Sequence, residues 1–115
     1  MKITSKYQPL KHYKWGNDCD GWTLVDGASL LIKQEQMPAS TSEVVHYHQK
    51  AAQFFFILEG KAQFEIEDVL VDICEGEGLH IEAGKKHRII NNTNESLEFI
   101  LCSQPSTNND RINVE

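Results

Sequence analysis

The sequence predicts an all-β domain made of two packed antiparallel sheets. Three observations favour this class: short runs in which apolar and polar residues alternate, turn residues between the runs at short intervals, and no helical apolar periodicity longer than two turns. Alternation buries one face of a strand, and many short strands with close turns are typical of a sandwich or a barrel.

The expected strands follow in chain order. Three candidates occupy residues 22–26, 30–37 and 43–48, and three alternating runs, each with one face expected in the core, occupy residues 62–66, 69–73 and 97–102. Turn-forming residues separate the later runs at positions 59–61, 67–68, 75–78, 83–86 and 91–94. We expect the polar segment 106–110 to be frayed.

One run, residues 53–58, does not alternate and reads Gln-Phe-Phe-Phe-Ile-Leu. Successive strand residues point to opposite faces, so this strand is apolar on both. One face belongs in the core, and the other needs a cover of its own. Either the N-terminal segment with Trp15 and Trp22 lies over it, or a second copy of the chain does. The expectation is a homodimer formed through this face.

Charge and length restrict the function. The chain has 115 residues, with 17 acidic and 11 basic side chains and a net charge of −6. This balance argues against a partner of nucleic acid or anionic membrane, because both require a basic face. The three cysteines, Cys19, Cys74 and Cys102, lie too far apart for a metal knuckle or a redox pair. With no apolar run of signal-peptide or membrane-spanning length, we expect a cytoplasmic protein with reduced cysteines.

Histidines give the clearest chemical signal. His46 and His48 stand at i and i+2 on a candidate strand, so both rings project from the same face, about 7 Å apart, while Tyr47 points away. Two such imidazoles can converge on one cation, and imidazole nitrogen suits iron, zinc, nickel, copper or manganese. The alternative for this pair alone is two exposed strand histidines.

Two stretches around these histidines resemble the two conserved motifs of the cupin superfamily, HXH…E…G and G…PXG…H…N. They read HYHQKAAQFFFILEG from position 46 and GEGLHIEAGKKHRIIN from position 76. The positions that match are His46, His48 and Gly60 in the first motif and Gly76, Gly84, His87 and Asn91 in the second.

The resemblance implies a cupin-type double-stranded β-helix, a jelly-roll barrel, and a single cupin domain over residues 1–115. Its conserved barrel would span about residues 30–103, with an N-terminal arm at 1–29 and a polar C-terminal tail at 104–115. The resemblance also implies a divalent transition metal (iron, zinc, manganese or nickel) held by His46, His48 and His87, with Gln53 in the place of the acidic ligand.

Three positions depart from the family pattern: Ser40 replaces a glycine, Glu82 a proline and Gln53 the glutamate. Three neutral imidazoles and an amide leave a divalent ion its full charge. Such an ion binds anionic oxygens more strongly, but is itself held more weakly, than one with a carboxylate ligand. The alternative is a pocket without metal, in which Gln53 is bonded to a histidine.

The predicted function is therefore a metal-dependent enzyme, dioxygenase-like or isomerase/lyase-like, acting on a small anionic organic substrate. The alternative is a non-catalytic module that binds or senses a small molecule. The N-terminal pair His12 and Tyr13 is expected either to cover the pocket or to pack. The remaining polar candidates are interpreted as structural or solvated: His80, Lys85 with Lys86, Arg111 as a tail contact, Glu43 as a surface residue, and Tyr47 as a packing residue.

Overall fold

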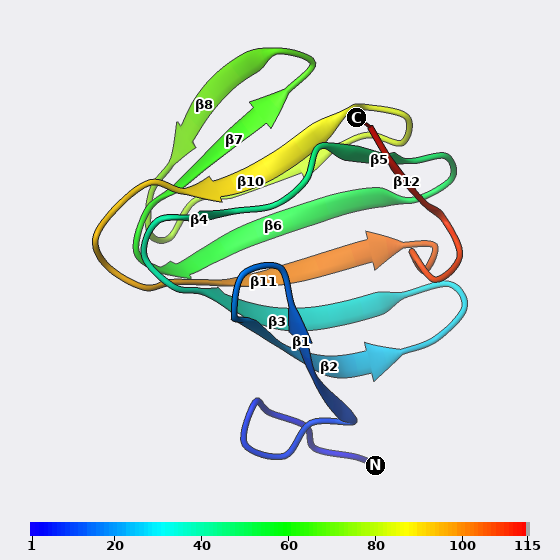
Figure 1. The fold of residues 1–115 in the computed structure, drawn as a ribbon. Coiled ribbons are helices and arrows are strands. Elements are labelled where there is room, and N and C mark those ends of the chain that lie inside the picture. The colour runs from blue at the N-terminus through cyan, green and yellow to red at the C-terminus, as the bar shows by residue number, and fades with distance from the viewer. Residues whose placement is uncertain (115) are drawn as a thin grey trace.

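Two antiparallel sheets face each other in the computed structural model, which describes residues 1–114 (Figure 1). One sheet has the strand order β1-β2-β3-β11-β6-β9, and the other has the order β12-β5-β10-β7-β8, with β4 paired to β10. The strands are β1 (Lys11–Trp15), β2 (Cys19–Asp26), β3 (Leu31–Met37), β4 (Thr41–Ser42), β5 (His46–His48), β6 (Ala52–Glu59), β7 (Ala62–Ile66), β8 (Val69–Ile73), β9 (Gly78–Ile81), β10 (His87–Asn91), β11 (Leu97–Gln104) and β12 (Arg111–Asn113).

This arrangement confirms the predicted all-β class and its two packed sheets. Within residues 1–114 every named element is a strand, so no helix there is long and apolar enough to cross a membrane.

Alternation along the strands builds the core between the sheets. On β7 and β11 most of the expected inward positions are buried, among them Phe64, Leu97 and Phe99, whereas Ile66 at the end of β7 is partly buried. The ring of Phe55 from β6 lies 4.9 Å from that of Phe64 and 5.7 Å from that of Phe99, measured between centroids. The contact with Phe64 joins the two sheets, the contact with Phe99 lies within one sheet, and Phe55 also lines the pocket described below.

The prediction that one face of the run 69–73 is buried is wrong. Glu67 and Asp68 both have positive φ, 48° and 67°, and form the tight turn that leads into β8. β8 ends its sheet and pairs only with β7, at the upper edge of the molecule in Figure 1. No strand of the other sheet covers it there, so Val69 is 65% exposed and only Ile73 is buried.

Both ends of the described chain add strands to the sheets. In the N-terminal segment, β1 and β2 extend one sheet beyond β3. In the C-terminal segment, β12 follows residues 106–110, which we expected to be frayed. β12 pairs with β5, and its register places Arg111 opposite His48 and Asn113 opposite His46. A three-residue polar strand has too few residues to show alternation, which is why the sequence pattern missed it.

The two apolar faces predicted for β6 are present. Phe55 and Ile57 point into the core, whereas Phe54 and Phe56 point outward and are 40% and 37% exposed. The N-terminal segment covers a neighbouring part of the same sheet, because the ammonium of Lys6 bonds to Glu98 at 2.9 Å. It does not bury the two outward phenylalanines.

Candidate metal centre

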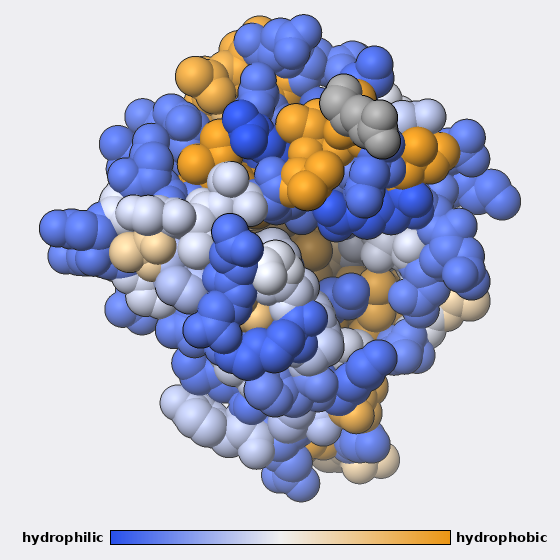
Figure 2. Space-filling model, viewed as in Figure 1, coloured by the Kyte–Doolittle hydropathy of each residue, from blue (hydrophilic) through white to orange (hydrophobic). Residues whose placement is uncertain are grey.

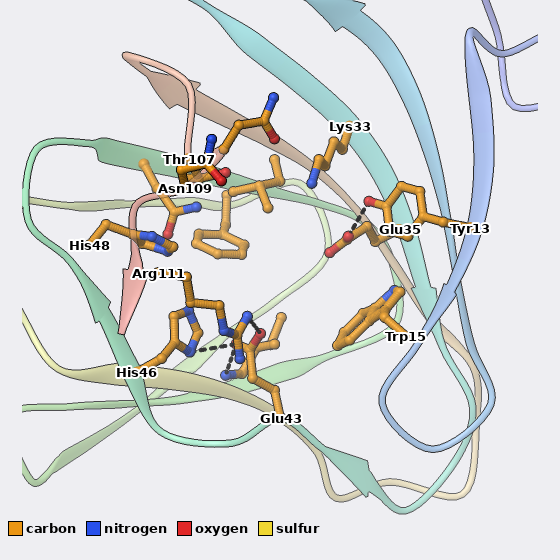
Figure 3. A pocket seen from close by; sticks show the side chains of 15 residues that line it. Tyr13, Trp15, Lys33, Glu35, Glu43, His46, His48, Thr107, Asn109 and Arg111 are labelled. Carbon is orange, nitrogen blue, oxygen red and sulfur yellow. Dashed lines mark hydrogen bonds and ion pairs between the residues drawn. The ribbon is translucent and has the colours of Figure 1, made fainter. Parts of the chain in front are cut away.

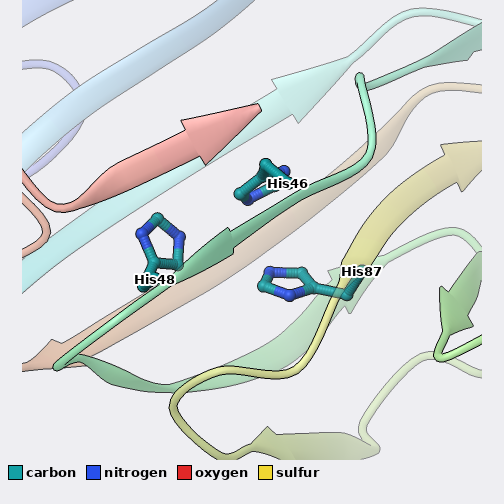
Figure 4. A group of neighbouring side chains, drawn as sticks. All are labelled: His46, His48 and His87. Carbon is teal, nitrogen blue, oxygen red and sulfur yellow. The ribbon is translucent and has the colours of Figure 1, made fainter. Parts of the chain in front are cut away.

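The three histidines of the two motifs meet between the sheets. His46 and His48 come from β5, and His87 begins β10, where the antiparallel register pairs it with His46. All three side chains are buried, and one ligand atom from each lies within 4.8 Å of the others. Figure 4 shows the rings turned toward a common space. This group can hold a metal ion.

Main-chain carbonyls orient each ring. The Nδ1–H groups of His46, His48 and His87 donate to the carbonyl oxygens of Val44, Asp110 and Lys85, each at 2.9 Å. Because a carbonyl only accepts, Nδ1 carries the proton and Nε2 keeps its lone pair. Burial lowers the pKa of all three imidazoles, that of His46 to about 3, so the rings are neutral at pH 7.

One nitrogen supports the fit of these residues to a cation. His48 Nε2 is buried and has no hydrogen-bond partner among residues 1–114. An unsatisfied buried acceptor is costly, and a cation in the space between the rings would satisfy it. Three neutral nitrogens are also the donor set expected for a divalent transition metal.

Gln53 reaches the same space from β6. Its side chain is buried, its Nε2 donates to the hydroxyl of Ser103 at 3.2 Å, and its Oε1 lies 3.2 Å from His87 Nε2. With His87 protonated on Nδ1, the two atoms of this last contact are both acceptors. Either a cation lies between them, or the amide is turned over and donates to the ring. The contact therefore fits both alternatives predicted from the sequence, metal ligand and bonded partner.

A cavity of about 300 Å³ opens beside the histidines. The face drawn in Figure 2 is hollowed near its centre, and Figure 3 shows the lining side chains. His46 and His48 stand on one side, while Tyr13, Lys33 and Glu35 from β1 and β3 stand on the other. Phe55, Ile89 and Leu101 provide the apolar part of the lining. The pocket thus combines polar groups on opposite walls with a water-excluding surface.

Glu43 is not the surface residue that we expected. Its carboxylate is buried, accepts from the Ile89 N–H at 3.2 Å, and lies 3.9 Å from His46 Nδ1. Burial raises its pKa to about 7, although the nearby guanidinium of Arg111 opposes the rise. The candidate strand 43–48 forms only at residues 46–48, so strict alternation is lost at Glu43 and its side chain turns inward.

Arg111 is also more than a tail contact. Its guanidinium bonds to Glu43 at 3.4 Å and lines the pocket, because β12 lies beside β5. Sequence reasoning missed this role because nothing in the local pattern of the tail predicts that pairing.

The other sequence candidates divide between pocket and surface. Tyr13 lines the pocket, whereas His12 stacks on Trp22 and bonds to Asp20 on the outside. Three of the side chains that we interpreted as structural or solvated, His80, Lys85 and Lys86, are exposed and do not line this pocket. Tyr47 is partly buried and does not line it either.

Comparison with known proteins places the chain. Residues 33–103 match the family model of the cupin domain. An uncharacterized protein from Methanocaldococcus jannaschii is 23% identical over 79 residues, which is 69% of this chain and 63% of that protein. The chain thus spans less than two thirds of the length of this relative.

Solved structures show the same fold. A protein from Klebsiella pneumoniae with a double-stranded β-helix domain has a TM-score of 0.82 at 13% identity, over 100% of this chain and 98% of that one. A predicted oxalate decarboxylase from Thermotoga maritima has a TM-score of 0.80 at 20% identity, over 92% and 100% of the two chains. With the jelly-roll sheets, the three-histidine group and a family match over most of its length, this chain belongs to the cupin family.

Proposed function

We propose that this protein is a metal-dependent enzyme that acts on a small anionic organic molecule. The observation that carries the proposal is the set of three buried, neutral imidazoles whose Nε2 atoms face one another beside a cavity of about 300 Å³. His48 Nε2 has no other partner within residues 1–114.

We assign His46, His48 and His87 as ligands and Gln53, through its Oε1, as the fourth. The bound ion would be iron, zinc, manganese or nickel, and it would supply Lewis-acid polarisation of an anionic substrate oxygen or, with iron, redox chemistry. An ion held only by neutral groups keeps a charge of +2, which favours an anionic substrate over a neutral one.

The surrounding residues of the chain support this role. Arg111 and Lys33 place a guanidinium and an ammonium in the pocket, beside the carboxyl groups of Glu43 and Glu35, and either cation can bind an anionic group of a substrate. Glu43 contacts both His46 and Arg111 and so fixes their relative positions. Phe55 lies against His87, with ring centroids 6.4 Å apart, and excludes water from that side.

Metal content tests the proposal. Protein stripped with a chelator and reloaded with iron(II), zinc, manganese or nickel is expected to bind one equivalent of at least one metal. His46→Ala and His87→Ala should abolish this binding, while His80→Ala, which removes an exposed histidine of β9, should leave it unchanged. A wild-type protein that binds no metal stoichiometrically, or histidine variants that bind as well as wild type, would contradict the proposal.

The reaction class requires a separate experiment. Dioxygenase-like chemistry predicts oxygen uptake by the iron-loaded protein with one of a panel of small organic anions. Isomerase- or lyase-like chemistry predicts conversion without oxygen, also with zinc or manganese. The Thermotoga maritima neighbour, a predicted oxalate decarboxylase, supports including dicarboxylates in the panel. Saturable binding of a panel member without any turnover would favour the alternative, a binding or sensing module.

We further propose that the protein is a cytoplasmic homodimer. The three free cysteines are compatible with a reducing compartment. The outward phenylalanines of β6 form an apolar surface that two copies related by a two-fold axis can bury against each other.

A further inference from the structure

We propose that Glu35 and Tyr13 form a second recognition site in the pocket, which binds a hydroxyl group of the substrate. A substrate that also carries an anionic oxygen at the histidine site is then a small hydroxy acid. This inference rests on the proposed function and names the substrate class.

Three neighbouring strands build this second site. The antiparallel registers place Tyr13 of β1 opposite Gly21 of β2, and Gly21 opposite Glu35 of β3. A Cβ atom at Gly21 would lie only 2.2 Å from Cζ of the Tyr13 ring. The missing side chain thus allows the phenol ring to cross over β2, where its hydroxyl donates to Oε2 of Glu35. The contact depends on a glycine at that one position.

Burying the carboxyl group of Glu35 at this place costs free energy. It lies on the inward face of β3, between the buried Leu31 and Met37, and is itself buried. Burial raises the pKa of its carboxyl, an effect that the hydrogen bond from Tyr13 and the charges of Lys33 and Arg111 partly offset. Its Oε1 atom has no hydrogen-bond donor among residues 1–114, although Glu35 lines the pocket. An acceptor is therefore open to a ligand.

The location of this acceptor relative to the histidines defines the ligand. Figure 3 shows Glu35 and Tyr13 on the wall opposite His46 and His48, with the cavity between them. The histidine side, with Arg111, takes an anionic oxygen, and the Glu35 side takes a hydrogen-bond donor. A molecule that spans both needs a carboxylate and a donor group separated by a short carbon chain.

Lys33 decides between the two common donors, a hydroxyl and an ammonium. Its Nζ lies 5.0 Å from the centroid of the Tyr13 ring, on the same wall as Glu35. A second ammonium beside it would be repelled, whereas a hydroxyl can donate to Glu35 and accept from Lys33. The set of charged groups around Glu35 therefore fits a hydroxy acid better than an amino acid.

Matched ligands test the inference. Zinc-loaded protein is titrated by calorimetry with butyrate, with its 2-, 3- and 4-hydroxy derivatives, and with the corresponding amino acids. We expect at least one hydroxybutyrate to bind about tenfold or more tightly than butyrate and than its amino analogue, because a buried acceptor left unpaired is costly.

Variants then locate the preference. Glu35→Gln and Tyr13→Phe should reduce the preference for the hydroxyl, and Gly21→Ala should do the same by displacing the Tyr13 ring, with zinc content unchanged in all three. Glu95→Gln and Tyr7→Phe make the same chemical changes at exposed positions and should have no effect. Tyr13→Phe removes only the hydroxyl and retains the packing of the ring, so its effect reports on the hydrogen bond to Glu35.

Two results would overturn the inference: equal affinity of wild type for butyrate and every hydroxybutyrate, including no binding of any, or a hydroxyl preference that survives both Glu35→Gln and Tyr13→Phe. If wild type takes up no metal at all, the proposed function fails first and this inference fails with it. Normal zinc content without the hydroxyl preference removes the inference alone.

Discussion

Gln53 differs from a glutamate at the same position by one unit of negative charge. Gln53→Glu would place that charge beside His87 and keep the contact with Ser103, whose hydroxyl can donate to a carboxylate. Because a carboxylate attracts a divalent ion more strongly than an amide does, we expect zinc affinity to rise about tenfold or more, measured by competition with a chromophoric chelator.

The matched control for this substitution is Gln63→Glu, which makes the same change on β7 outside the pocket. It should leave zinc affinity as it is in wild type. Equal affinities of Gln53→Glu and wild type would show that position 53 does not contact the ion, and the assigned ligand set would shrink to the three histidines.

His46 predicts a pH dependence of the metal-free protein. Burial lowers its folded-state pKa to about 3, whereas an unfolded histidine titrates near pH 6.5. Between these values the unfolded chain binds more protons, so the stability contributed by the neutral ring is present above about pH 6.5 and is lost as the pH falls. The slope per histidine is at most about 1.4 kcal/mol per pH unit.

Glu43 contributes a pH dependence of the opposite sign, because its raised pKa makes the folded protein less stable as the pH rises toward 7. The contribution of His46 is therefore measured as a difference between wild type and a variant. Denaturant unfolding of wild type and His46→Gln in chelator should show a shallower acid dependence in the variant between about pH 4 and 6.5. Identical slopes would mean that His46 is not held neutral by the fold.

At the residue level, the sequence could predict those site residues whose spacing alone carries the information. His46 and His48 share a strand face, and His87 follows a glycine turn at the spacing of a known motif. Glu35 and Tyr13 could not be found this way, because their contact depends on the register of three strands and on the space left by Gly21. The pairing register between strands that are distant in the sequence cannot be predicted from any one segment.

At the level of elements, the segment that leads into β12 holds the turn between β5 and β6. Asp110 accepts hydrogen bonds from the backbone N–H groups of Gln49 at 2.9 Å and of Lys50 and Ala51 at 3.0 Å. Its own carbonyl orients His48. One residue near the C-terminal end therefore fixes both the turn and the ring of a proposed ligand.

Asp110→Ala removes the three side-chain hydrogen bonds but keeps the carbonyl. We expect faster amide hydrogen exchange at residues 49–51 and weaker metal binding, because the turn that follows His48 loses its acceptor. Asp26→Ala, at an exposed aspartate of β2, is the control. Unchanged exchange protection at residues 49–51 in Asp110→Ala would show that β12 alone holds this turn.

Strand prediction succeeded on β6, where it concerns only the face to which each side chain points. On β6 the inward Phe55 and Ile57 and the outward Phe54 and Phe56 follow directly from the alternation of faces. For β8 the same rule misleads, because an apolar alternation says nothing about whether another sheet lies opposite. The terminal place of β8 in its sheet is a property of the topology, and the local pattern does not contain it.

On the scale of the whole molecule, net charge proves a poor guide to the ligand. The chain carries −6, yet Arg111 and Lys33 line the pocket and the histidine group can hold a cation. The same pocket also holds the carboxyl groups of Glu35 and Glu43, so an anion there would be attracted mainly by the cation that the histidine group can hold. The acidic surface still argues against nucleic acid and anionic membranes as partners.

The proposed homodimer depends on the outward side chains of β6. Phe54 and Phe56 are stacked with their ring centroids 6.4 Å apart, and the Phe54 ring occupies the space beside Gly78, where a Cβ would lie 2.3 Å from its Cζ. The two rings therefore form one continuous aromatic surface, which suits an isologous contact with a second copy.

We expect sedimentation velocity to give a species of twice 13.1 kDa for wild type and a monomer for the Phe54→Asp/Phe56→Asp double variant. Both side chains already lie partly in water, so the double variant should keep its fold, which circular dichroism checks. Val69→Asp, an equally drastic change at the exposed edge strand β8, should remain dimeric. If the double variant sediments like wild type, the apolar face of β6 is not the contact between subunits. If Val69→Asp alone dissociates the dimer, the contact lies on the other sheet, at the exposed apolar residues of β8.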